Sequence, residues 1–567
     1  MTSAAGGGLA GYIWETRYRD PGADPPETGL EDSWRRVARA AAAVERDPGI
    51  WAGRFLALLR DCRFLPAGRI LAGAGASRAT TLFNCFVLGP IEDAINGVHA
   101  ALAEAAQTMQ MGGGIGHDFS TLAPRGQSTP QGPAPGIVAW LELWDAMCRT
   151  VTAAGTRRGA MMATLRCDHP DVLEFIQAKR HGGGLSCFNL SVLVSDALLE
   201  AVERDADWPL AFPAGGAVHR VVRARELWQT LCDSAHASAE PGVLFIDRIN
   251  AANNLGYCET ISATNPCGEE PLPPYGACNL GSLNLTAYVR DPFTAAAQLD
   301  LTALAADAAV ATRLLDNVID LSLLPLARQR AVVHGARRIG LGITGLADAL
   351  ALLRLRYDSE AARAAGAQAM QTICVAAYRC STELATERGP FPAFDAAAYL
   401  ARPFIQGLPQ ELRGRIADCG IRNSHLTAIA PAGTISLLAG GVSSGIEPLF
   451  ALEGLRNVRA PDGSIRQFTV TDYAWRRWQE RQPEVAPVPE WFVTGAAVAA
   501  VDHLRMQAAL QRWVDGAISK TIALPPDQPP AATAELFRRA WTLGLKGCTV
   551  FRAGTRSCVV AEAAPVS

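Results

Sequence analysis

Segments in which an apolar strand leads through a glycine-containing turn into a helix recur along the chain, and this pattern constrains the fold most. Residues 336–357, ARRIGLGITGLADALALLRLRY, read as a strand, a glycine-rich turn and a helix. Residues 188–202, FNLSVLVSDALLEAV, read as a strand that passes into a helix. Strands that alternate with helices favour a parallel sheet covered by helices. We therefore predict an α/β fold, either a large barrel or an open sheet, with its site on the loops at the strand ends.

The length and charge of the chain narrow its function. Its 567 residues, 49% of them hydrophobic, are too many for one small domain and can bury a large core. A formal net charge of −3 provides no overall attraction for nucleic acid or an anionic membrane. The N-terminal sequence lacks the basic start and apolar run of a signal peptide, and no apolar stretch is long enough to cross a bilayer. We expect a cytoplasmic, enzyme-sized protein with no nucleic-acid or membrane partner.

The chain has no low-complexity linker, so its domain boundaries are predicted from local patterns. Residues 1–30 are rich in glycine and proline and are expected to be poorly ordered, and helical spacing follows to about residue 60. We predict an N-terminal helical cap over residues 1–60, a barrel domain over 61–552 and a flexible tail over 553–567. Longer helices are expected at residues 98–111, 137–153, 301–327, 359–388, 500–519 and 531–544.

The fourteen cysteines are scattered, and no two of them are spaced as Cys-x-x-Cys. This argues against a zinc ribbon and against a disulfide-stapled secreted fold. In a reducing cytosol most of these cysteines are expected to be packed thiols and a few to be redox-active, and their spacing does not say which.

Residues 261–285, ISATNPCGEEPLPPYGACNLGSLNL, concentrate side chains suited to catalysis. The proline and the glycine beside the central cysteine disfavour a helix, so an extended chain or a loop is expected. In an extended chain alternate side chains share a face, which would bring together Asn265, Cys267 and Glu269. A second thiol, Cys278, follows eleven residues later. Either this is an active-site loop with a reactive cysteine at its tip, or Cys267 is a buried cysteine in an ordinary loop.

Two glycine-containing turns have the composition of ligand-binding loops. Residues 431–436, PAGTIS, follow a predicted strand at 425–430 and lead into a helix, so free N–H groups, the helix dipole and two hydroxyls could bind an anion. They do not match a Walker motif, and an ordinary helix N-cap is the alternative. The glycine run at 112–116 allows a ligand to approach the backbone closely, or simply ends the preceding helix.

Taken together, these segments resemble the ribonucleotide reductases, in particular the adenosylcobalamin-dependent (class II) branch that acts on ribonucleoside diphosphates. NPCGE followed by ACNLGSLNL is similar to the active-site loop of that family. The other matching segments are TLFNCFVLGPIEDA, MGGGIGHDFSTLAPRG, GTRRGAMMATLRCDHPDVLEFI, RRIGLGITGLADAL, PAGTISLLAGGVSSGIEPLF and AISKTI…LGLKGCT. The resemblance extends from about Phe64 to about Arg552, which is nearly the whole chain.

The resemblance implies a ten-stranded α/β barrel of two parallel five-stranded half-sheets, with a central finger loop that carries Cys267 at its tip. It implies reduction of ribonucleoside diphosphates to 2′-deoxyribonucleoside diphosphates, the precursors of DNA. Adenosylcobalamin is the implied cofactor and starts a thiyl radical on Cys267, so no separate radical-generating subunit is expected.

The resemblance also assigns roles to individual residues. The thiyl takes the 3′-hydrogen of the ribose, Glu269 accepts the 3′-OH proton and Asn265 holds the substrate. Cys85 and Cys278 are the implied thiol pair, which protonates the leaving water and ends as a disulfide, so their Cα atoms should lie within about 7 Å of each other. The implied substrate-binding residues are Asn84, Gly114, Asn265, Cys267, Glu269 and, for the diphosphate, Pro431, Ala432, Gly433, Thr434 and Ile435.

Regulation and partners are implied less directly. The loops near Asp93, Arg125 and His181–Leu185 resemble regions that bind a dNTP specificity effector, and solvated loops are the alternative. A thioredoxin-like external dithiol reductant and a homodimer are further implied partners. Because no Asp-x-His-x-x-Gly motif is present, we expect no protein histidine to ligate cobalt and predict no metal-ligating residue.

Three features depart from the wider family. Class I large subunits have adjacent tyrosines near the C-terminus, whereas residues 548–551 are Cys-Thr-Val-Phe, which favours a cofactor bound directly over the site. There is no room for an N-terminal nucleotide-binding cone, so no ATP/dATP on–off switch is expected. Family tails usually end in a close cysteine pair, but here Cys558 lies ten residues after Cys548. An external dithiol protein acting directly and an alternative tail are both open as routes to re-reduce the disulfide.

Three rival functions are compatible with parts of the sequence. The chain could be a class I-type large subunit that needs a separate radical-generating protein. It could be a glycyl-radical enzyme, although residues 551–554, Phe-Arg-Ala-Gly, match the required Arg-Val-x-Gly-type tail poorly. It could also be a catalytically silent nucleotide-binding regulator, against which the complete set of Asn265, Cys267, Glu269 and two further thiols argues.

Overall fold

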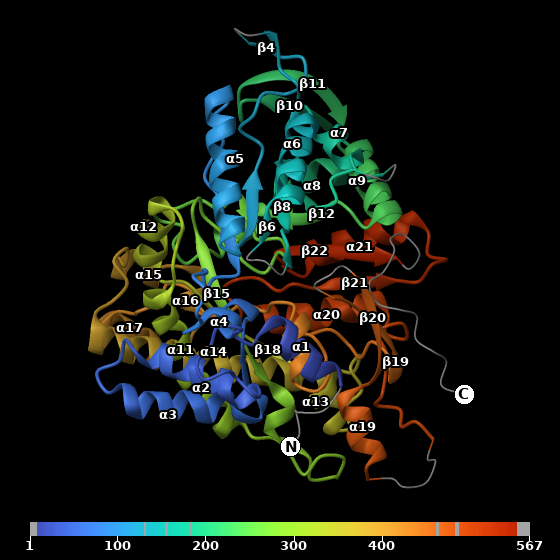
Figure 1. Cartoon of the computed structure of the whole chain (residues 1–567). Coiled ribbons are helices and arrows are strands. Elements are labelled where there is room, and N and C mark those ends of the chain that lie inside the picture. Colours follow the sequence, from blue (N-terminus) through green and yellow to red (C-terminus); the bar gives the residue numbers. More distant parts are fainter. Residues whose placement is uncertain are drawn as a thin grey trace.

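The structure is a computed structural model that describes residues 8–129, 132–153, 157–180, 184–460, 464–481 and 487–552. The strands of the largest sheet lie at the centre of the molecule with helices around them, and several of the smaller two-stranded sheets lie at its periphery (Figure 1). The largest sheet has ten strands: nine belong to the barrel, and the tenth, β1 (Phe64–Pro66), pairs antiparallel with one of them.

Five parallel strands form one half of the central sheet. Nearly all of their side chains are buried, as expected for parallel strands that are covered on both faces. In spatial order they are β2 (Cys85–Val87), β3 (Gly114–Asp118), β8 (Met161–Arg166), β9 (Phe188–Val194) and β12 (Gly242–Phe245). The helices between them include α5 (Ile95–Gln110), α6 (Ile137–Thr150) and α9 (Ala224–Ser238).

The second half contains five parallel segments as well. Two regular ladders join β15 (Ala277–Asn284) to β18 (Ile339–Thr344) and β21 (Thr521–Leu524) to β22 (Gly547–Arg552). Between these ladders lies the segment 425–430, which pairs through two isolated parallel bridges, Leu341↔Thr427 and Ile429↔Ile518. The sequence predicted a regular strand here, and the structure has only these single bridges.

The two halves meet antiparallel at both seams, where β15 pairs with β2 and β22 pairs with β12. Together with the bridges at 425–430, these seams complete a ring of ten segments. The predicted ten-stranded α/β barrel of two parallel half-sheets is therefore confirmed, and the open sheet is not observed. At the first seam, Cys278 is the direct partner of Cys85.

Helices α1 (Leu9–Arg17), α2 (Leu30–Ala42) and α3 (Pro48–Leu59) pack against the outside of the barrel, at the bottom of Figure 1. Buried Glu45, which follows α2, joins them to α11 (Leu301–Leu321) through Arg313, at 2.7 Å. Burial opposes the charge of Glu45, but hydrogen bonds from Arg313, Asn317 and Arg388 hold its pKa at about 2. A buried carboxylate with several cationic partners fixes the orientation of the packed elements.

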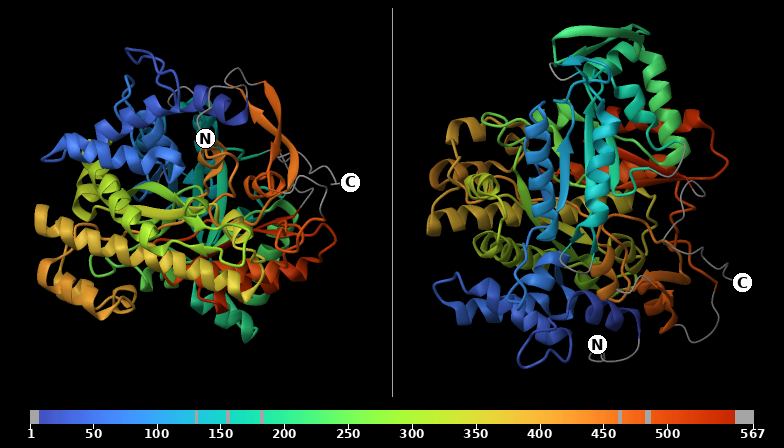
Figure 2. Two further views of the ribbon diagram at one scale, coloured as in Figure 1. Left: turned by 90° about the horizontal axis from the view of Figure 1, so that it is seen from below. Right: turned by 45° about the horizontal axis from the view of Figure 1, so that its top comes forward.

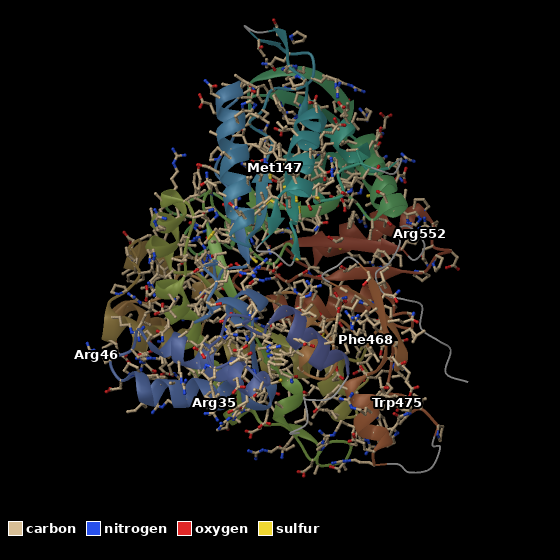
Figure 3. The ribbon with its side chains drawn as sticks, viewed as in Figure 1. Arg35, Arg46, Met147, Phe468, Trp475 and Arg552 are labelled. Atoms are coloured by element: carbon tan, nitrogen blue, oxygen red, sulfur yellow. The ribbon has the colours of Figure 1, made fainter. Side chains whose placement is uncertain are left out.

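The N-terminal segment differs from its expected disorder, because α1 is a helix that packs against α18 (Gly433–Leu438). Tyr12 of α1 contacts Phe468 of the hairpin β19 (Glu453–Arg459)–β20 (Ile465–Thr471), with ring centroids 5.3 Å apart. Figure 3 labels Phe468, and Figure 2 shows this hairpin and the N-terminal helices on the same side of the molecule. The start of the chain thus covers one end of the barrel.

Several predicted helices are shorter in the structure. The helix expected at 301–327 ends at Leu321, because Pro325 disfavours helical continuation and α12 (Ala327–Ala336) begins after it. The helix expected at 500–519 is α20 (Ala500–Gln511), since residues 517–519 pair within the barrel instead. α14 (Glu360–Arg388) is capped by Ser359, whose hydroxyl accepts a hydrogen bond from the Ala362 N–H. In the described part of the chain, no helix combines the length and apolarity needed to span a bilayer.

Candidate active site

The finger is a short hairpin inside the barrel, formed by β13 (Ala263–Thr264) and β14 (Pro271–Leu272). Its tip is a turn rather than an extended chain, with the Gly268 N–H donating to the Asn265 carbonyl at 3.1 Å. The finger lies directly against β3, because a Cβ on Gly116 would be 1.9 Å from the Thr264 carbonyl oxygen. Only glycine permits this approach.

A cavity of about 380 Å³, here called the α18 cavity, lies between the finger, β2 and the start of α18. The three finger residues predicted to share a face, Asn265, Cys267 and Glu269, all line it. The turn at the finger tip therefore brings these three side chains to one cavity, although alternation along an extended strand was expected to do so. The other predicted residues that line this cavity are Asn84, Cys85, Gly114, Pro431, Gly433, Thr434 and Ile435.

Cys85 is the centre of a small polar cluster in this cavity. The Asn265 side-chain amide donates to the Cys85 sulfur at 3.0 Å, and the Cys85 thiol donates to Glu269 Oε1 at 3.7 Å. Asn265 is itself held by the Glu270 N–H, which donates to its side-chain oxygen at 3.0 Å. All three cavity residues of this cluster are at least 97% buried, so their orientations are fixed by their mutual contacts.

Cys278 lies behind Cys85 and does not line the cavity. It is fully buried and is the direct antiparallel partner of Cys85 across the β2–β15 seam. Directly opposed residues in antiparallel strands have Cα atoms roughly 4.5–5.5 Å apart, which lies within the range that a disulfide requires. The structure thus brings together the two thiols that are 193 positions apart in sequence.

The carboxylate of Glu269 has the environment of a general base. Burial raises its pKa to about 6, although hydrogen bonds from Asn265 and Cys85 favour the charged form. Its Oε2 is buried and has no hydrogen-bond partner among the described residues, which leaves one oxygen for a bound molecule. Burial and the nearby Glu269 charge raise the pKa of the Cys85 thiol well above its usual value, so Cys85 stays protonated.

The predicted anion loop forms the wall of the α18 cavity opposite the finger, where α18 begins at Gly433. Thr434 contacts the Tyr18 hydroxyl at 2.5 Å, so α1 supports this wall. Ala432 and Ser436 are the two predicted members that do not line the cavity. Both are buried: the Ala432 N–H donates to the Ser444 hydroxyl at 2.8 Å, and the Ser436 hydroxyl donates to the Gly433 carbonyl at 2.9 Å.

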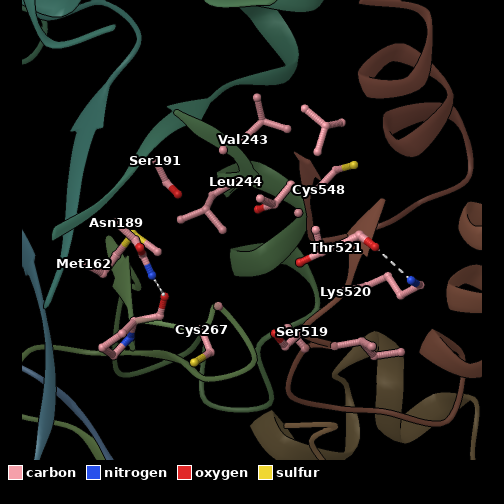
Figure 4. Close-up of a pocket in the computed structure, with 18 of the residues that line it drawn as sticks. Met162, Asn189, Ser191, Val243, Leu244, Cys267, Ser519, Lys520, Thr521 and Cys548 are labelled. Atoms are coloured by element: carbon pink, nitrogen blue, oxygen red, sulfur yellow. Dashed lines mark hydrogen bonds between the residues drawn. The ribbon is translucent and has the colours of Figure 1, made fainter. Parts of the chain in front are cut away.

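A second cavity of about 330 Å³, here called the β22 cavity, lies on the other side of the finger tip. It shares Pro266, Cys267 and Pro431 with the α18 cavity, so Cys267 is exposed towards the interior of the barrel on two sides. Figure 4 places Cys267 beside side chains from β8, β9, β12, β21 and β22. Asn189 of β9 donates to the Pro266 carbonyl at 2.8 Å and thereby holds the finger tip (Figure 4).

The lining of the β22 cavity is mostly small or apolar. Its hydroxyl side chains are Ser191, Ser519, Thr521 and Thr549. Three charged side chains also line it. The Lys520 ammonium is paired with Glu447 and donates to the Thr521 carbonyl at 2.9 Å, Glu240 is paired with Lys179 at 2.9 Å, and Lys546 donates to backbone carbonyls. Among the described residues no group of His, Cys, Asp and Glu side chains could hold a metal ion.

The residues expected to bind an effector lie away from both cavities. Asp93 is exposed in the loop before α5. Arg125 is exposed as well and forms an ion pair with Glu174 at 2.5 Å. His181 lies outside the described residues, so the structure does not place the effector loop that contains it.

Sequence reasoning missed several residues of the two cavities. Arg69 and Ser282 line the α18 cavity, and the arginine in PAGR, just after the β1 (Phe64–Pro66) strand, was the available signal. The strands of the β22 cavity were recognised only as barrel strands, because their small and apolar side chains form no chemical motif.

Comparison with protein families assigns the class. The model for "Ribonucleotide reductase, barrel domain" matches residues 83–551, and the model for "Ribonucleotide reductase, all-alpha domain" matches residues 7–79. The barrel model alone spans most of the chain, so the chain belongs to the ribonucleotide reductase family. The two models meet between residues 79 and 83, whereas the sequence analysis put the boundary at residue 60.

Three relatives show which members of the family the chain is similar to. The chain is 40% identical over 555 residues to the vitamin B12-dependent ribonucleoside-diphosphate reductase of Mycobacterium tuberculosis (strain CDC 1551 / Oshkosh), covering 94% of this chain and 77% of the relative. It is 35% identical over 534 residues to the protein of the same name from Thermoplasma acidophilum, covering 91% and 67%. It is 24% identical over 608 residues to the ribonucleoside-diphosphate reductase subunit alpha of Chlamydia muridarum, covering 93% and 57%.

Proposed function

We propose that this protein reduces ribonucleoside diphosphates to deoxyribonucleoside diphosphates for DNA synthesis, with adenosylcobalamin as its cofactor and no separate radical-generating subunit. Relatives that are 40% and 35% identical carry names with this substrate and this cofactor dependence. The observation that carries the proposal is the position of Cys267, whose thiol lies at the boundary of two cavities. The α18 cavity has residues suited to binding a nucleotide, and the β22 cavity lets a second bound group reach the same Cys267 sulfur.

The α18 cavity is the proposed nucleotide site. The first turn of α18 and the Thr434 hydroxyl face the diphosphate, since helix N-termini favour anions. The ribose then lies between this wall and the finger, against Asn84 and Gly114. The Cys267 sulfur takes the 3′-hydrogen atom, and Glu269, with an oxygen available and a pKa of about 6, takes the 3′-OH proton.

Cys85 and Cys278 are the proposed reductant pair. Cys85 lines the cavity and gives its proton to the departing 2′-hydroxyl, which leaves as water. The pair also passes a second proton and two electrons to the substrate, which supply the new hydrogen at C2′, and closes a disulfide across the β2–β15 seam. Cys267 then returns the hydrogen atom to C3′. The Cys278→Ser variant should therefore complete at most one turnover, and repeated turnover by this variant would contradict the assignment.

The β22 cavity is the proposed entrance for the adenosyl arm of the cofactor. At about 330 Å³ it is at the lower end of small-molecule pockets and is too small for a whole cobalamin. The hydroxyls of Ser191, Ser519 and Thr549 can hydrogen-bond this arm, which when bound would displace the solvent from the mostly apolar wall. When bound, adenosylcobalamin supplies the radical that is passed to Cys267. That no protein histidine ligates the cobalt stays a prediction.

Further partners are proposed on the family resemblance alone. They are a dNTP specificity effector near Asp93, Arg125 and His181, a thioredoxin-like dithiol reductant, and a second copy of the chain in a homodimer. The cytoplasmic location and the boundaries at residues 60 and 552 likewise stay predictions.

The direct test is an assay of CDP reduction by the purified chain with a dithiol, with and without adenosylcobalamin and with each dNTP in turn. We expect dCDP only when the cofactor is present and expect no requirement for a second protein. Formation of dCDP that depends on an added radical-generating protein, and not on adenosylcobalamin, would support the rival class I-type subunit.

A further inference from the structure

Glu270 follows Glu269 in the finger but faces a different part of the molecule. Glu269 lines the α18 cavity, whereas Glu270 does not and is 96% buried. Its Oε1 lies beside Gly340, which pairs with Leu280, two residues after Cys278 on the same strand. The Cys278 thiol donates to the Asn279 carbonyl at 3.3 Å, and the Glu270 carboxyl group is close enough to raise the pKa of that thiol. Glu270 Oε1 is buried and has no hydrogen-bond partner among the described residues. None of the roles proposed above uses this carboxyl group.

The surroundings of Glu270 form a built site. β18 leaves room for the carboxyl group at Gly340, where a Cβ would lie 2.5 Å from Glu270 Oε1. The carboxyl group also borders a cavity of about 10 Å³, roughly the space of one water molecule. Charged or titratable neighbours around this cavity are Arg338, His425, Asp515 and Lys546.

Lys546 connects this small cavity to the accessible one. It lines both the small cavity beside Glu270 and the β22 cavity. Its ammonium donates to the carbonyls of Asp515 and Gly516 at 2.6 and 2.7 Å. These two hydrogen bonds hold the ammonium between the small cavity and the β22 cavity. On the path from the buried Cys278 thiol to the β22 cavity, Glu270 comes first and Lys546 second. The β22 cavity is large enough to hold solvent.

The titration of these groups is consistent with proton exchange. Burial, with the charges of Glu269 and Asp515, raises the pKa of Glu270 to about 8, against the effects of Cys278 and Arg338. Burial lowers the pKa of Lys546 to about 8, against the attraction of Asp515 and Glu270. Burial and the Glu270 charge raise the pKa of the Cys278 thiol well above its usual value. At neutral pH Glu270 therefore carries a proton, and a Cys278 thiolate would be strongly disfavoured.

We propose that Glu270 donates a proton to Cys278 each time the active-site disulfide is reduced, and that Lys546 links Glu270 to the β22 cavity for its reprotonation. The proposal rests on the proposed function, because it needs the Cys85–Cys278 disulfide as a reaction product.

The geometry fixes the order of bond changes. A thiolate of the external dithiol attacks the sulfur of Cys85, which lines the α18 cavity, and the disulfide bond breaks with its electron pair on Cys278. Glu270 gives its carboxyl proton to the Cys278 sulfur and becomes a carboxylate, which regains a proton through Lys546. The second thiol of the reductant then attacks the mixed disulfide and leaves its proton on Cys85. Two protein thiols and one oxidised reductant result.

The test follows disulfide reduction itself and needs no cofactor. Wild type and Glu270→Gln are oxidised with diamide, and the return of the Cys85 and Cys278 thiols on adding dithiothreitol is followed by alkylation and mass spectrometry. We expect the disulfide of Glu270→Gln to be reduced about 10²- to 10³-fold more slowly, the effect of losing an acid catalyst. Corrected for the thiolate fraction of the reductant, the wild-type rate should fall as pH rises through about 8. The slow Glu270→Gln rate should not show this fall.

Two comparisons separate proton donation from a structural effect. Glu259→Gln removes the carboxylate that pairs with Arg338 and leaves Glu270 in place. Because unpaired Arg338 favours the charged form of Glu270, the rate should still fall with rising pH, but at a lower pH than in wild type. A carboxylic-acid band that titrates near pH 8 should appear in the infrared spectrum of wild type and be missing from Glu270→Gln. Its absence from wild type would overturn the proposal, even if the variant failed to fold.

A wild-type rate and pH dependence in Glu270→Gln would also overturn the proposal. Failure of the proposed function gives a different result: pre-reduced wild type would make no dCDP in a single turnover with adenosylcobalamin. Pre-reduced Glu270→Gln should make as much dCDP in that single turnover as wild type, because its thiols are already protonated.

Discussion

The two cavities that meet at Cys267 are built from different kinds of residues. The α18 cavity contains an amide, a carboxylate and a second thiol in mutual contact, at Asn265, Glu269 and Cys85. The β22 cavity contains mostly small and apolar side chains, and its charged groups have protein partners: Lys520 pairs with Glu447, Glu240 pairs with Lys179, and Lys546 donates to two backbone carbonyls. The α18 cavity therefore concentrates side chains that can exchange protons with a substrate, whereas the β22 cavity offers a mostly apolar surface to a bound group.

Replacing the shared sulfur should have the largest effect, because it disables both sides at once. We expect Cys267→Ser to lose on the order of 10⁴-fold or more in CDP reduction, since a hydroxyl does not exchange a hydrogen atom as a thiol does. Binding of CDP and of adenosylcobalamin, measured by equilibrium dialysis, should stay near wild type. Cys258→Ser, at an exposed cysteine that lines neither cavity, is the matched control. Full turnover by Cys267→Ser would show that the sulfur shared by the two cavities does not take part in the reaction.

The sequence predicted one side of this comparison far better than the other. Ten predicted site residues line the α18 cavity, although Arg69 and Ser282 were missed. These ten could be predicted because they lie in motifs that resemble those of a known family. The β22 cavity was not predicted, because Gly242, Ser191 and Thr549 have ordinary strand side chains that meet only when three distant segments pair. Helix α1 was missed for a related reason, since its stability comes from packing on α18 rather than from a strong helical pattern.

The finger shows a further limit of sequence reasoning. Asn265, Cys267 and Glu269 were expected to share a face through the alternation of an extended strand. They do line one cavity, but a turn brings them there. The sequence left an extended chain and a loop as alternatives, and the structure has a turn. The close packing of the finger against Gly116 could not be predicted, because it joins segments that are far apart in the sequence.

Removing the base should affect only the α18 side. We expect Glu269→Gln to lower kcat by about 10²- to 10³-fold, the usual effect of losing general base catalysis. Burial raises the pKa of Glu269 to about 6, and a base acts in its deprotonated form, so wild-type kcat/KM for CDP should rise as pH increases through about 6. The variant should lack this rise while its affinity for adenosylcobalamin stays unchanged. A variant that keeps the same rise would show that another group is the base.

Filling the opposite cavity should affect only the β22 side. Ser191→Leu places a larger apolar side chain in the β22 cavity, where overpacking has a cost. We expect the concentration of adenosylcobalamin for half-maximal activity to increase about tenfold, which corresponds to about 1.4 kcal/mol. The KM for CDP should change less than about twofold on the same scale. An increase in the KM for CDP with unchanged cofactor dependence would show that the β22 cavity binds the nucleotide, so that the roles proposed for the two cavities are reversed.

The smallest effect is expected at the edge of the α18 cavity, where α1 supports the anion loop. Tyr18→Phe removes the 2.5 Å contact between the Tyr18 hydroxyl and Thr434. One such hydrogen bond contributes about 0.5–1.5 kcal/mol, so the KM for CDP should increase roughly two- to tenfold with little change in kcat. Tyr12→Phe, inside α1, is the matched control for Tyr18, which follows the last residue of α1, because the Tyr12 hydroxyl is buried with no hydrogen-bond partner among the described residues. If both variants raise KM equally, the effect comes from the packing of α1 and not from the bond to Thr434. If only Tyr18→Phe does, the N-terminal helix helps to form the nucleotide site.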